Sequence, residues 1–133
     1  MHLVTVGTVE SALTDLAAAP RQGDEGGPEA VLVFEEDFLD ALDGISVGDE
    51  LLVITWLHLA DRDVLRVHPR GDRSREEQGV FNTRSPDRPN PLGLHRVDVR
   101  SIDGRRLRVG HLEAVSGTPI IDVKPVLGGI EER

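Results

Sequence analysis

Residues 101–107 read SIDGRRL, and this short stretch carries the sharpest structural signal in the chain. Its Asp103-Gly104 pair joins two segments in which apolar residues alternate with charged or small ones. These apolar residues are Val97, Val99, Leu107 and Val109. Alternation with a period of two is typical of a strand with one buried face, and Asp-Gly between two such runs is typical of a primed hairpin turn. The pattern predicts a β-hairpin.

Further strands are predicted on the N-terminal side of this hairpin. Their signal is a high content of β-branched residues combined with alternation. The predicted strands are Leu3 to Val9, Ala30 to Phe34, Leu51 to Leu57 and Val64 to Val67. Short strands with frequent turn residues favour an all-β barrel or sandwich, because a doubly wound sheet would show strands alternating with helices.

One short helix and two loops complete the predicted outline. Apolar residues recur near helical spacing at Phe38, Leu39, Leu42 and Ile45. Asp37 is the expected N-cap of this helix and Gly44 its expected C′ residue. Residues 19–28 (APRQGDEGGP) are predicted to form an exposed loop, and the arginine-rich residues 61–77 a mobile one.

Length and composition restrict the class of protein. A chain of 133 residues is the usual size of one domain, and we expect a single domain over residues 1–133. No apolar run approaches the roughly 20 residues of a membrane helix, and no signal peptide is visible, so we expect a soluble, cytoplasmic protein that binds no membrane. The absence of cysteine excludes disulfides, thiolate metal sites and a cysteine nucleophile, and we expect no metal.

Charge is distributed unevenly along the chain. The net charge is −9, which disfavours nucleic acid as a partner. Residues 62–108, however, hold twelve arginines against seven acidic residues, whereas residues 1–61 hold thirteen acidic residues and one base. The arginine-rich middle could form a local positive surface for RNA, or its arginines could pair with neighbouring carboxylates.

A second unusual stretch is residues 79–94, which read GVFNTRSPDRPNPLGL. Three prolines fix backbone angles there and hold the residues before them extended, which predicts a rigid loop. Arg84 and Arg88 present guanidinium groups suited to a carboxylate or phosphate, and Asn90 adds an amide. The loop either grips a ligand with little loss of entropy or forms ordinary surface salt bridges.

Residues 116–125 read SGTPIIDVKP and form a third candidate segment. A Gly-Thr-Pro turn leads into a predicted strand on which Asp122 and Lys124 share one face. These two side chains could line a cleft, or they could form an exposed structural ion pair.

Together these segments resemble the TsaA-like family, whose characterised bacterial members methylate N6 of threonylcarbamoyladenosine in tRNA. The matching motifs run through nearly the whole chain in the family's order. They are Gly7 with Ser11, Pro20-Arg21-Gln22, Trp56 with His58, Gly79-Val80-Phe81, Thr83-Arg84-Ser85-Pro86, Arg88-Pro89-Asn90-Pro91, Gly93-Leu94, and Gly117-Thr118-Pro119 with Asp122, Lys124 and Pro125.

The resemblance implies a single-sheeted β-barrel, a homodimer, S-adenosyl-L-methionine as cofactor and tRNA as partner. It implies catalytic roles for His58, Asp122 and Lys124. The cofactor-binding residues that it implies are Gln22, Phe81, Arg84, Ser85, Arg88, Asn90, Gly93, Leu94, Thr118 and Pro119. Holding the activated methyl group in line with its acceptor would supply most of the acceleration, and an N6 acceptor also needs a modest base or a water.

The sequence departs from the family pattern close to these motifs. His95 stands where a small hydroxyl residue is usual, and Asn82, Ser116 and Val126 also differ from the common residues. The chain ends soon after the Asp-x-Lys-Pro motif, so we expect it to lack the C-terminal extension of many tRNA-modifying members. Two alternatives therefore stay open: a different methyl acceptor, or a non-catalytic module that binds S-adenosyl-L-methionine.

Overall fold

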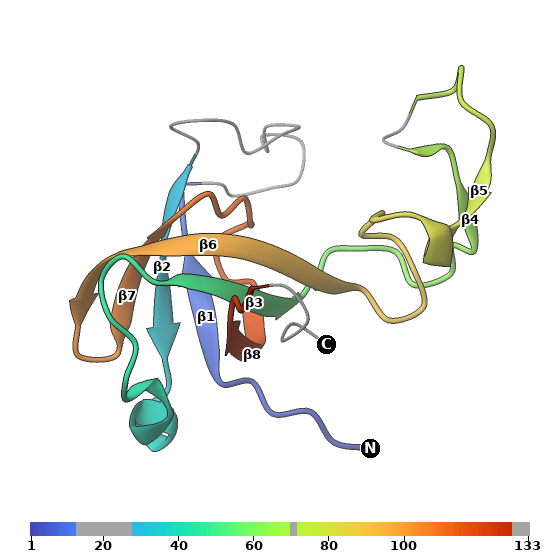
Figure 1. Ribbon diagram of the computed structural model, residues 1–133. Helices are drawn as coiled ribbons and strands as arrows, with labels where there is room; N and C mark the ends of the chain where they lie inside the picture. Colours follow the sequence, from blue (N-terminus) through green and yellow to red (C-terminus); the bar gives the residue numbers. More distant parts are fainter. Residues whose placement is uncertain (13–27, 70–71, 129–133) are drawn as a thin grey trace.

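The computed structural model describes residues 1–12, 28–69 and 72–128, and these form a mostly β structure (Figure 1). Six of the described strands build one antiparallel sheet in the order β1-β2-β7-β6-β3-β8, and β8 pairs back to β1, so that the sheet closes on itself. These strands are β1 (Gly7–Glu10), β2 (Glu29–Phe34), β3 (Glu50–Trp56), β6 (Leu92–Asp103), β7 (Arg106–Gly110) and β8 (Pro119–Pro125). The all-β prediction is confirmed. No helix in the described ranges is long and apolar enough to cross a membrane.

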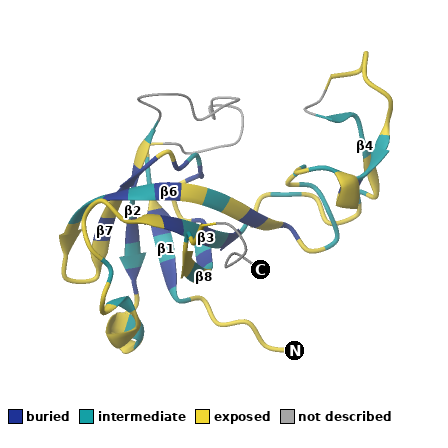
Figure 2. Ribbon diagram, in the orientation of Figure 1, coloured by how far each residue is buried: buried dark blue, intermediate teal, exposed yellow. Residues whose placement is uncertain are grey.

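The interior of the closed sheet is filled by every second residue of its strands (Figure 2). Leu32 of β2, Val53 of β3 and Val109 of β7 are fully buried. Burial of such side chains contributes roughly 1.5–3 kcal/mol each, which makes this alternation the main source of stability. The core is aliphatic because the chain has few aromatic residues.

The predicted hairpin is β6 followed by β7, with Asp103 paired to Arg106. The two turn residues are Gly104 and Arg105, one position later than the Asp-Gly pair suggested. Gly104 has a φ of 58°, and Arg105 is not among the residues with positive φ. Positive φ at the first turn position alone fits a type II′ turn, so the primed class was correct.

The predicted helix and the first strand differ in detail. The helix is the 3₁₀ element η2 (Glu36–Leu42), and its N-cap is Glu35 instead of Asp37. Gly44 follows it with a φ of 95°, as expected for a C′ glycine. The first strand begins only at Gly7, because Leu3 and Val4 are exposed and pair with no strand of the described chain.

An arm leaves the sheet after β3 and returns at β6 (Figure 1). It contains a two-stranded ladder of β4 (Arg66–Val67) and β5 (Gln78–Gly79), followed by the 3₁₀ turn η4 (Val80–Asn82). The residues after β4 were predicted to form a mobile loop, and the described part of residues 68–77 is a loop that connects β4 to β5. The Arg66–Glu77 ion pair of 2.8 Å lies at its base, and the mobility of the loop stays a prediction. The predicted strand Val64 to Val67 is shortened to two residues.

Gly7 allows β1 and β2 to approach closely, and its replacement by Ala should lower the free energy of unfolding by about 1–3 kcal/mol. A Cβ at this position would lie 2.6 Å from the carbonyl oxygen of Val33, so the paired backbones would have to separate. Urea denaturation followed by circular dichroism measures the loss.

Gly110→Ala is the matched control. Its Cβ would meet the guanidinium group of Arg100, which is the free end of a flexible side chain. Arg100 can move away at the cost of half-exposed ion pairs with Glu29 and Asp98, each worth roughly 1 kcal/mol or less. Equal losses in the two variants would contradict the backbone explanation for Gly7.

Candidate functional site

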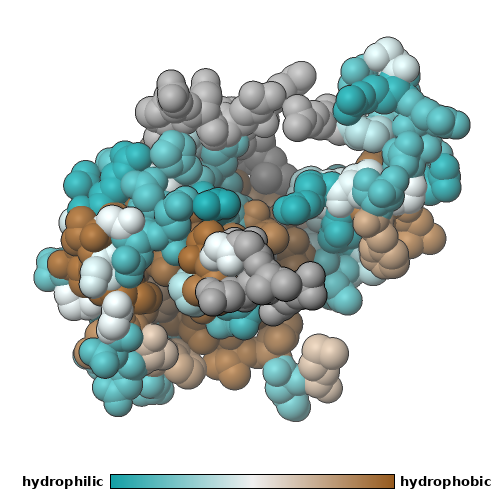
Figure 3. Space-filling model, in the orientation of Figure 1, coloured by the Kyte–Doolittle hydropathy of each residue, from teal (hydrophilic) through white to brown (hydrophobic). Residues whose placement is uncertain are grey.

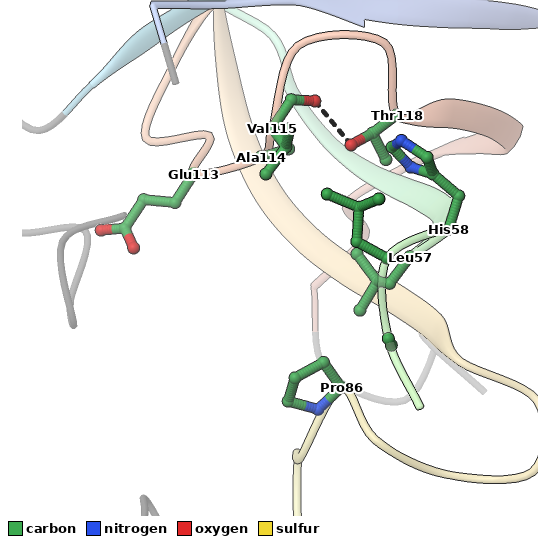
Figure 4. Close-up of a pocket in the computed structure, with 9 residues that line it drawn as sticks. Leu57, His58, Pro86, Glu113, Ala114, Val115 and Thr118 are labelled. Atoms are coloured by element: carbon green, nitrogen blue, oxygen red, sulfur yellow. Dashed lines mark hydrogen bonds between the residues drawn. The ribbon is translucent and has the colours of Figure 1, made fainter. Parts of the chain in front are cut away.

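An apolar cavity of about 60 Å³ opens where β3 ends. Leu57 and His58, which directly follow β3, face the segment that leads into β8, and Pro86 approaches from the arm (Figure 4). The lining residues are Leu57, His58, Leu59, Ala60, Pro86, Glu113, Ala114, Val115 and Thr118. An apolar cavity beside an imidazole can hold an uncharged ring or aliphatic chain next to a group able to carry a proton.

The turn before β8 gives this cavity one wall. The Thr118 hydroxyl donates to the Val115 carbonyl at 2.6 Å, and the Gly117 N–H donates to the Val9 carbonyl at 2.7 Å. Gly117 has a φ of 93°, a conformation that favours glycine. The Gly-Thr-Pro motif is therefore a fixed corner between the core and the cavity.

A second cavity of about 290 Å³ lies beside the first, and Pro86 lines both. It is bounded by Val67, Pro69, Asn82, Thr83, Arg84, Ser85 and Pro86. Arg84 is exposed, and within the described residues no hydrogen bond or ion pair of its side chain is found. The second cavity therefore brings a cation beside the apolar one.

Arg88 ties together the proline-rich loop, residues 83–91 between η4 and β6. Its Nε donates to the Ser85 carbonyl at 2.8 Å, and its Nη2 donates to the carbonyls of Val80 and Thr83 at 2.7 and 2.6 Å. The Arg88 guanidinium therefore donates its hydrogen bonds to backbone carbonyls of residues 80–85. The structure thus gives Arg88 a bracing position and leaves Arg84 turned outward.

A polar pair lies near Leu57, one of the residues that line the first cavity. Thr55 is fully buried, and its Oγ1 shares a hydrogen bond of 2.8 Å with Nε2 of His95. A Cβ on Gly93 would lie 2.5 Å from that Oγ1 and 3.1 Å from Leu57, so the glycine makes room for the pair. Burial lowers the pKa of His95 to about 4, which keeps the imidazole neutral at pH 7.

Comparison with known proteins settles the family. The model of the tRNA-methyltransferase O N-terminal domain matches residues 8–131. The chain belongs to this family. Members of the TrmO family are S-adenosyl-L-methionine-dependent methyltransferases, which defines the reaction class and the cofactor.

Two archaeal relatives cover most of the chain. A "Probable S-adenosyl-L-methionine-binding protein" of Methanothermobacter thermautotrophicus is 44% identical over 126 residues, which are 95% of this chain and 90% of the relative. An S-adenosyl-L-methionine-binding protein of Archaeoglobus fulgidus is 40% identical over 124 residues, 93% of this chain and 88% of the relative.

A solved structure shares the fold. The crystal structure of TrmO from Pseudomonas aeruginosa superposes with a TM-score of 0.75 at 24% identity, and the match covers 96% of this chain. It covers 56% of the other chain, so the present chain spans a little over half the length of that protein.

Several of the residues expected from TrmO-family motifs gather around the two cavities. His58 and Thr118 line the first, and Arg84 and Ser85 line the second. Pro119 directly follows Thr118 and begins β8. Pro86 of the proline-rich loop and Thr118 of the Gly-Thr-Pro segment line the same cavity at this end of the sheet.

Asp122 and Lys124 lie apart from His58. They form an exposed ion pair of 3.3 Å on β8, and Asp122 lines a third cavity of about 390 Å³ together with Phe38 and Ile45 near η2. The structure therefore does not gather the three predicted catalytic residues in one cavity. Of the two alternatives for Asp122 and Lys124, the exposed structural ion pair agrees with their observed contact.

The remaining predicted cofactor residues are scattered. Phe81 is 83% exposed on the arm, and Leu94 is exposed on the outer face of β6. Asn90 lies in the loop, with its side chain held by Arg62. Gln22 lies outside the described residues.

Sequence reasoning missed the contacts of Arg62, the place of Glu113 in the first cavity and the partly buried position of His95. No motif marked Arg62, whose place depends on how the arm folds back, or Glu113, which lies in the segment between β7 and β8. The sequence marked His95 only as a departure from the family pattern. Its hydrogen-bond partner is Thr55 on β3, which lies opposite Gly93 in the strand pairing.

His95 makes stability depend on pH. Its folded pKa of about 4 lies below the ordinary value of 6.5, so protons bind the unfolded chain first as the pH falls. We expect the free energy of unfolding to fall by about 2 kcal/mol between pH 7 and pH 5, and His95→Gln to remove most of that fall. Urea denaturation at both pH values measures it.

The carboxylates that arginines bind on the sheet do not account for the fall between pH 7 and pH 5. Hydrogen bonds from arginine lower the pKa values of Glu29, Glu50 and Asp98, so these groups titrate below that range. The same loss of stability in the wild type and in His95→Gln would contradict the assignment.

Proposed function

We propose that this chain transfers the methyl group of S-adenosyl-L-methionine to N6 of threonylcarbamoyladenosine in cytoplasmic tRNA. The observation that carries the proposal is the pair of adjoining cavities, in which His58 and an apolar lining lie beside Arg84 and share Pro86. Membership of the family indicates the reaction class, and the residues of the two cavities are the proposed binding site for the cofactor and the acceptor.

The residues present fit the cofactor. An apolar wall that includes Leu57, Ala114 and Val115 suits a nucleobase or an aliphatic chain, and the free guanidinium of Arg84 suits a carboxylate. S-adenosyl-L-methionine supplies an activated methyl group. The apolar side chains exclude water, Arg84 holds a charged end, and His58 accepts the proton that leaves N6.

A homodimer completes the proposal. Ligand pockets measure roughly 300–1,000 Å³, so the first cavity, at about 60 Å³, is too small to enclose a nucleoside within one copy. Leu92 and Leu94 expose apolar surface on the outer face of β6, next to Ile54 and Trp56 of β3. A second copy covering this face would enlarge the enclosure.

The arm is the part of the described chain best suited to RNA. Arginines of the closed sheet are neutralised: Arg96 pairs with Glu50, Arg100 and Arg108 with Glu29, and Arg106 with Glu10. Arg73, Arg75 and Arg84 on the arm form no ion pair within the described residues. Figure 3 shows polar side chains over the outer end of the arm. These three exposed guanidinium groups support a phosphate contact despite the net charge of −9.

The proposed reaction is tested by mass spectrometry of tRNA nucleosides. Purified protein is incubated with labelled S-adenosyl-L-methionine and threonylcarbamoylated tRNA, and we expect the labelled N6-methyl product. His58→Gln should lose most of the product while it still binds S-adenosylhomocysteine, because the imidazole accepts the proton that leaves N6 and is not needed to bind the cofactor. Labelled product on unmodified tRNA but not on threonylcarbamoylated tRNA would overturn the choice of acceptor.

A second candidate function is a non-catalytic module that binds S-adenosyl-L-methionine. The names of the two archaeal relatives favour it, since both are described by binding alone. Tight binding of S-adenosylhomocysteine, with no label transferred to any tRNA, would select it over the enzyme.

Arg84 and Arg88 should respond differently to replacement. Arg84→Ala should lower affinity for S-adenosylhomocysteine about ten- to a hundredfold, as for loss of one charge-assisted hydrogen bond of roughly 1.5–3 kcal/mol, with the melting temperature unchanged. Arg88→Ala should lower the melting temperature, because three backbone carbonyls lose their donors. Calorimetric titration and thermal denaturation measure the two effects.

The opposite pattern would exchange the two roles. If Arg88→Ala lowers the affinity for S-adenosylhomocysteine and leaves the melting temperature unchanged, Arg88 contacts the ligand, and its hydrogen bonds to the loop do not stabilise the protein.

A further inference from the structure

Arg62 joins the end of β3 to the proline-rich loop. Its guanidinium lies over the ring of Trp56, with 5.0 Å between Cζ and the ring centroid. The same group donates from Nε to the Pro89 carbonyl at 2.8 Å and from Nη2 to Oδ1 of Asn90 at 3.1 Å. One planar side chain thus rests on an aromatic surface and holds two groups of the loop.

Two further hydrogen bonds, made by backbone groups next to Arg62, join the end of β3 to the proline-rich loop. The Asp61 N–H donates to Oδ1 of Asp87 at 2.8 Å, and the Arg88 N–H donates to the Asp61 carbonyl at 3.1 Å. Four hydrogen bonds therefore connect the segment that follows the first cavity to the proline-rich loop. Asp61 and Arg62 make them on one side and residues 87–90 on the other. The junction holds Arg62 in register with Asn90.

The contact with Arg62 decides which way the Asn90 amide points. A guanidinium can only donate hydrogen bonds, so the amide oxygen must face it and the NH₂ group must face away. No hydrogen bond within the described residues uses that NH₂ group, and Asn90 is exposed. The loop therefore presents two amide donors to whatever binds there.

We propose that Arg62 is a positioning residue, which orients Asn90 to donate hydrogen bonds to an acceptor group of the bound nucleoside cofactor, such as a carboxylate or a ring nitrogen. The inference rests on the proposed function and deepens it, because it names the kind of ligand atom that the loop recognises. A reversed amide would present its oxygen and would repel a carboxylate.

Asn90→Asp separates this role from a structural one. The carboxylate keeps the contact with Arg62 as an ion pair, so the melting temperature should stay the same or rise, but the donors are lost. We expect affinity for S-adenosylhomocysteine to fall about ten- to a hundredfold by calorimetric titration. Wild-type affinity in Asn90→Asp would overturn the inference.

Arg62 variants test the positioning step. Arg62→Ala should lower the affinity by a similar factor, and Arg62→Lys should recover little of it, because an ammonium cannot stack on Trp56 and contact both loop groups. Trp56 is the single tryptophan of the chain, so its fluorescence reports directly on the stack, and Arg62→Ala should shift its emission. Unchanged affinity in Arg62→Ala would overturn the inference.

Arg106→Ala is the matched control, since this arginine pairs with Glu10 on the closed sheet, and none of its hydrogen bonds or ion pairs within the described residues involves the loop. It should bind S-adenosylhomocysteine as the wild type does. A wild type that binds no S-adenosylhomocysteine would overturn the proposed function and this inference together. Binding by the wild type and equally by Asn90→Asp would overturn the inference alone.

Discussion

The hydrogen bonds of β8 hold the two ends of the sheet together, and the site depends on them. Val6 N–H donates to the Ile120 carbonyl and Val9 N–H to the Thr118 carbonyl, both at 2.9 Å, while the other edge of β8 pairs with β3 along its length. Without this closure, the Gly117 corner would not lie against the residues that follow Trp56. The cavity is thus a consequence of strand pairing, because its two walls come from chain segments some sixty residues apart.

The arm is ordered by a different kind of interaction. Only Val80 among the described residues 61–90 is buried, so apolar burial contributes little there. Arginine side chains replace it: Arg66 binds Glu77, Arg88 binds three carbonyls, and Arg62 binds the loop. Such contacts are directional and largely exposed, and they set geometry more than they add stability. The ligand-type residues therefore occupy a part of the molecule that is positioned by hydrogen bonds and supported by a closed apolar core.

The sequence predicted those features that depend on near neighbours. Alternation placed the β6–β7 hairpin, and proline chemistry identified a rigid loop. The sequence could not predict that Asp122 lines the cavity near η2 while Thr118, four residues earlier, lines the cavity of His58. The reason is the register shift between Ile54 and Thr55, which changes how β8 faces β3. The role of Arg62 was equally hidden, because it requires Trp56 and Asn90 to meet across a folded arm.

The position of acidic residues explains why the arginines of the sheet create little net charge there. Glu10, Glu29 and Glu50 come from the acidic first half of the chain and pair with arginines of β6 and β7. Strand pairing brings these charges together, so most of the arginine excess of the sheet is cancelled locally. The arm lies outside that pairing. Its Arg73, Arg75 and Arg84 form no ion pair within the described residues, and acidic residues such as Asp72 and Glu76 lie among them in the sequence. Local charge in this protein therefore follows from topology, and the net charge alone does not determine which partners it can bind.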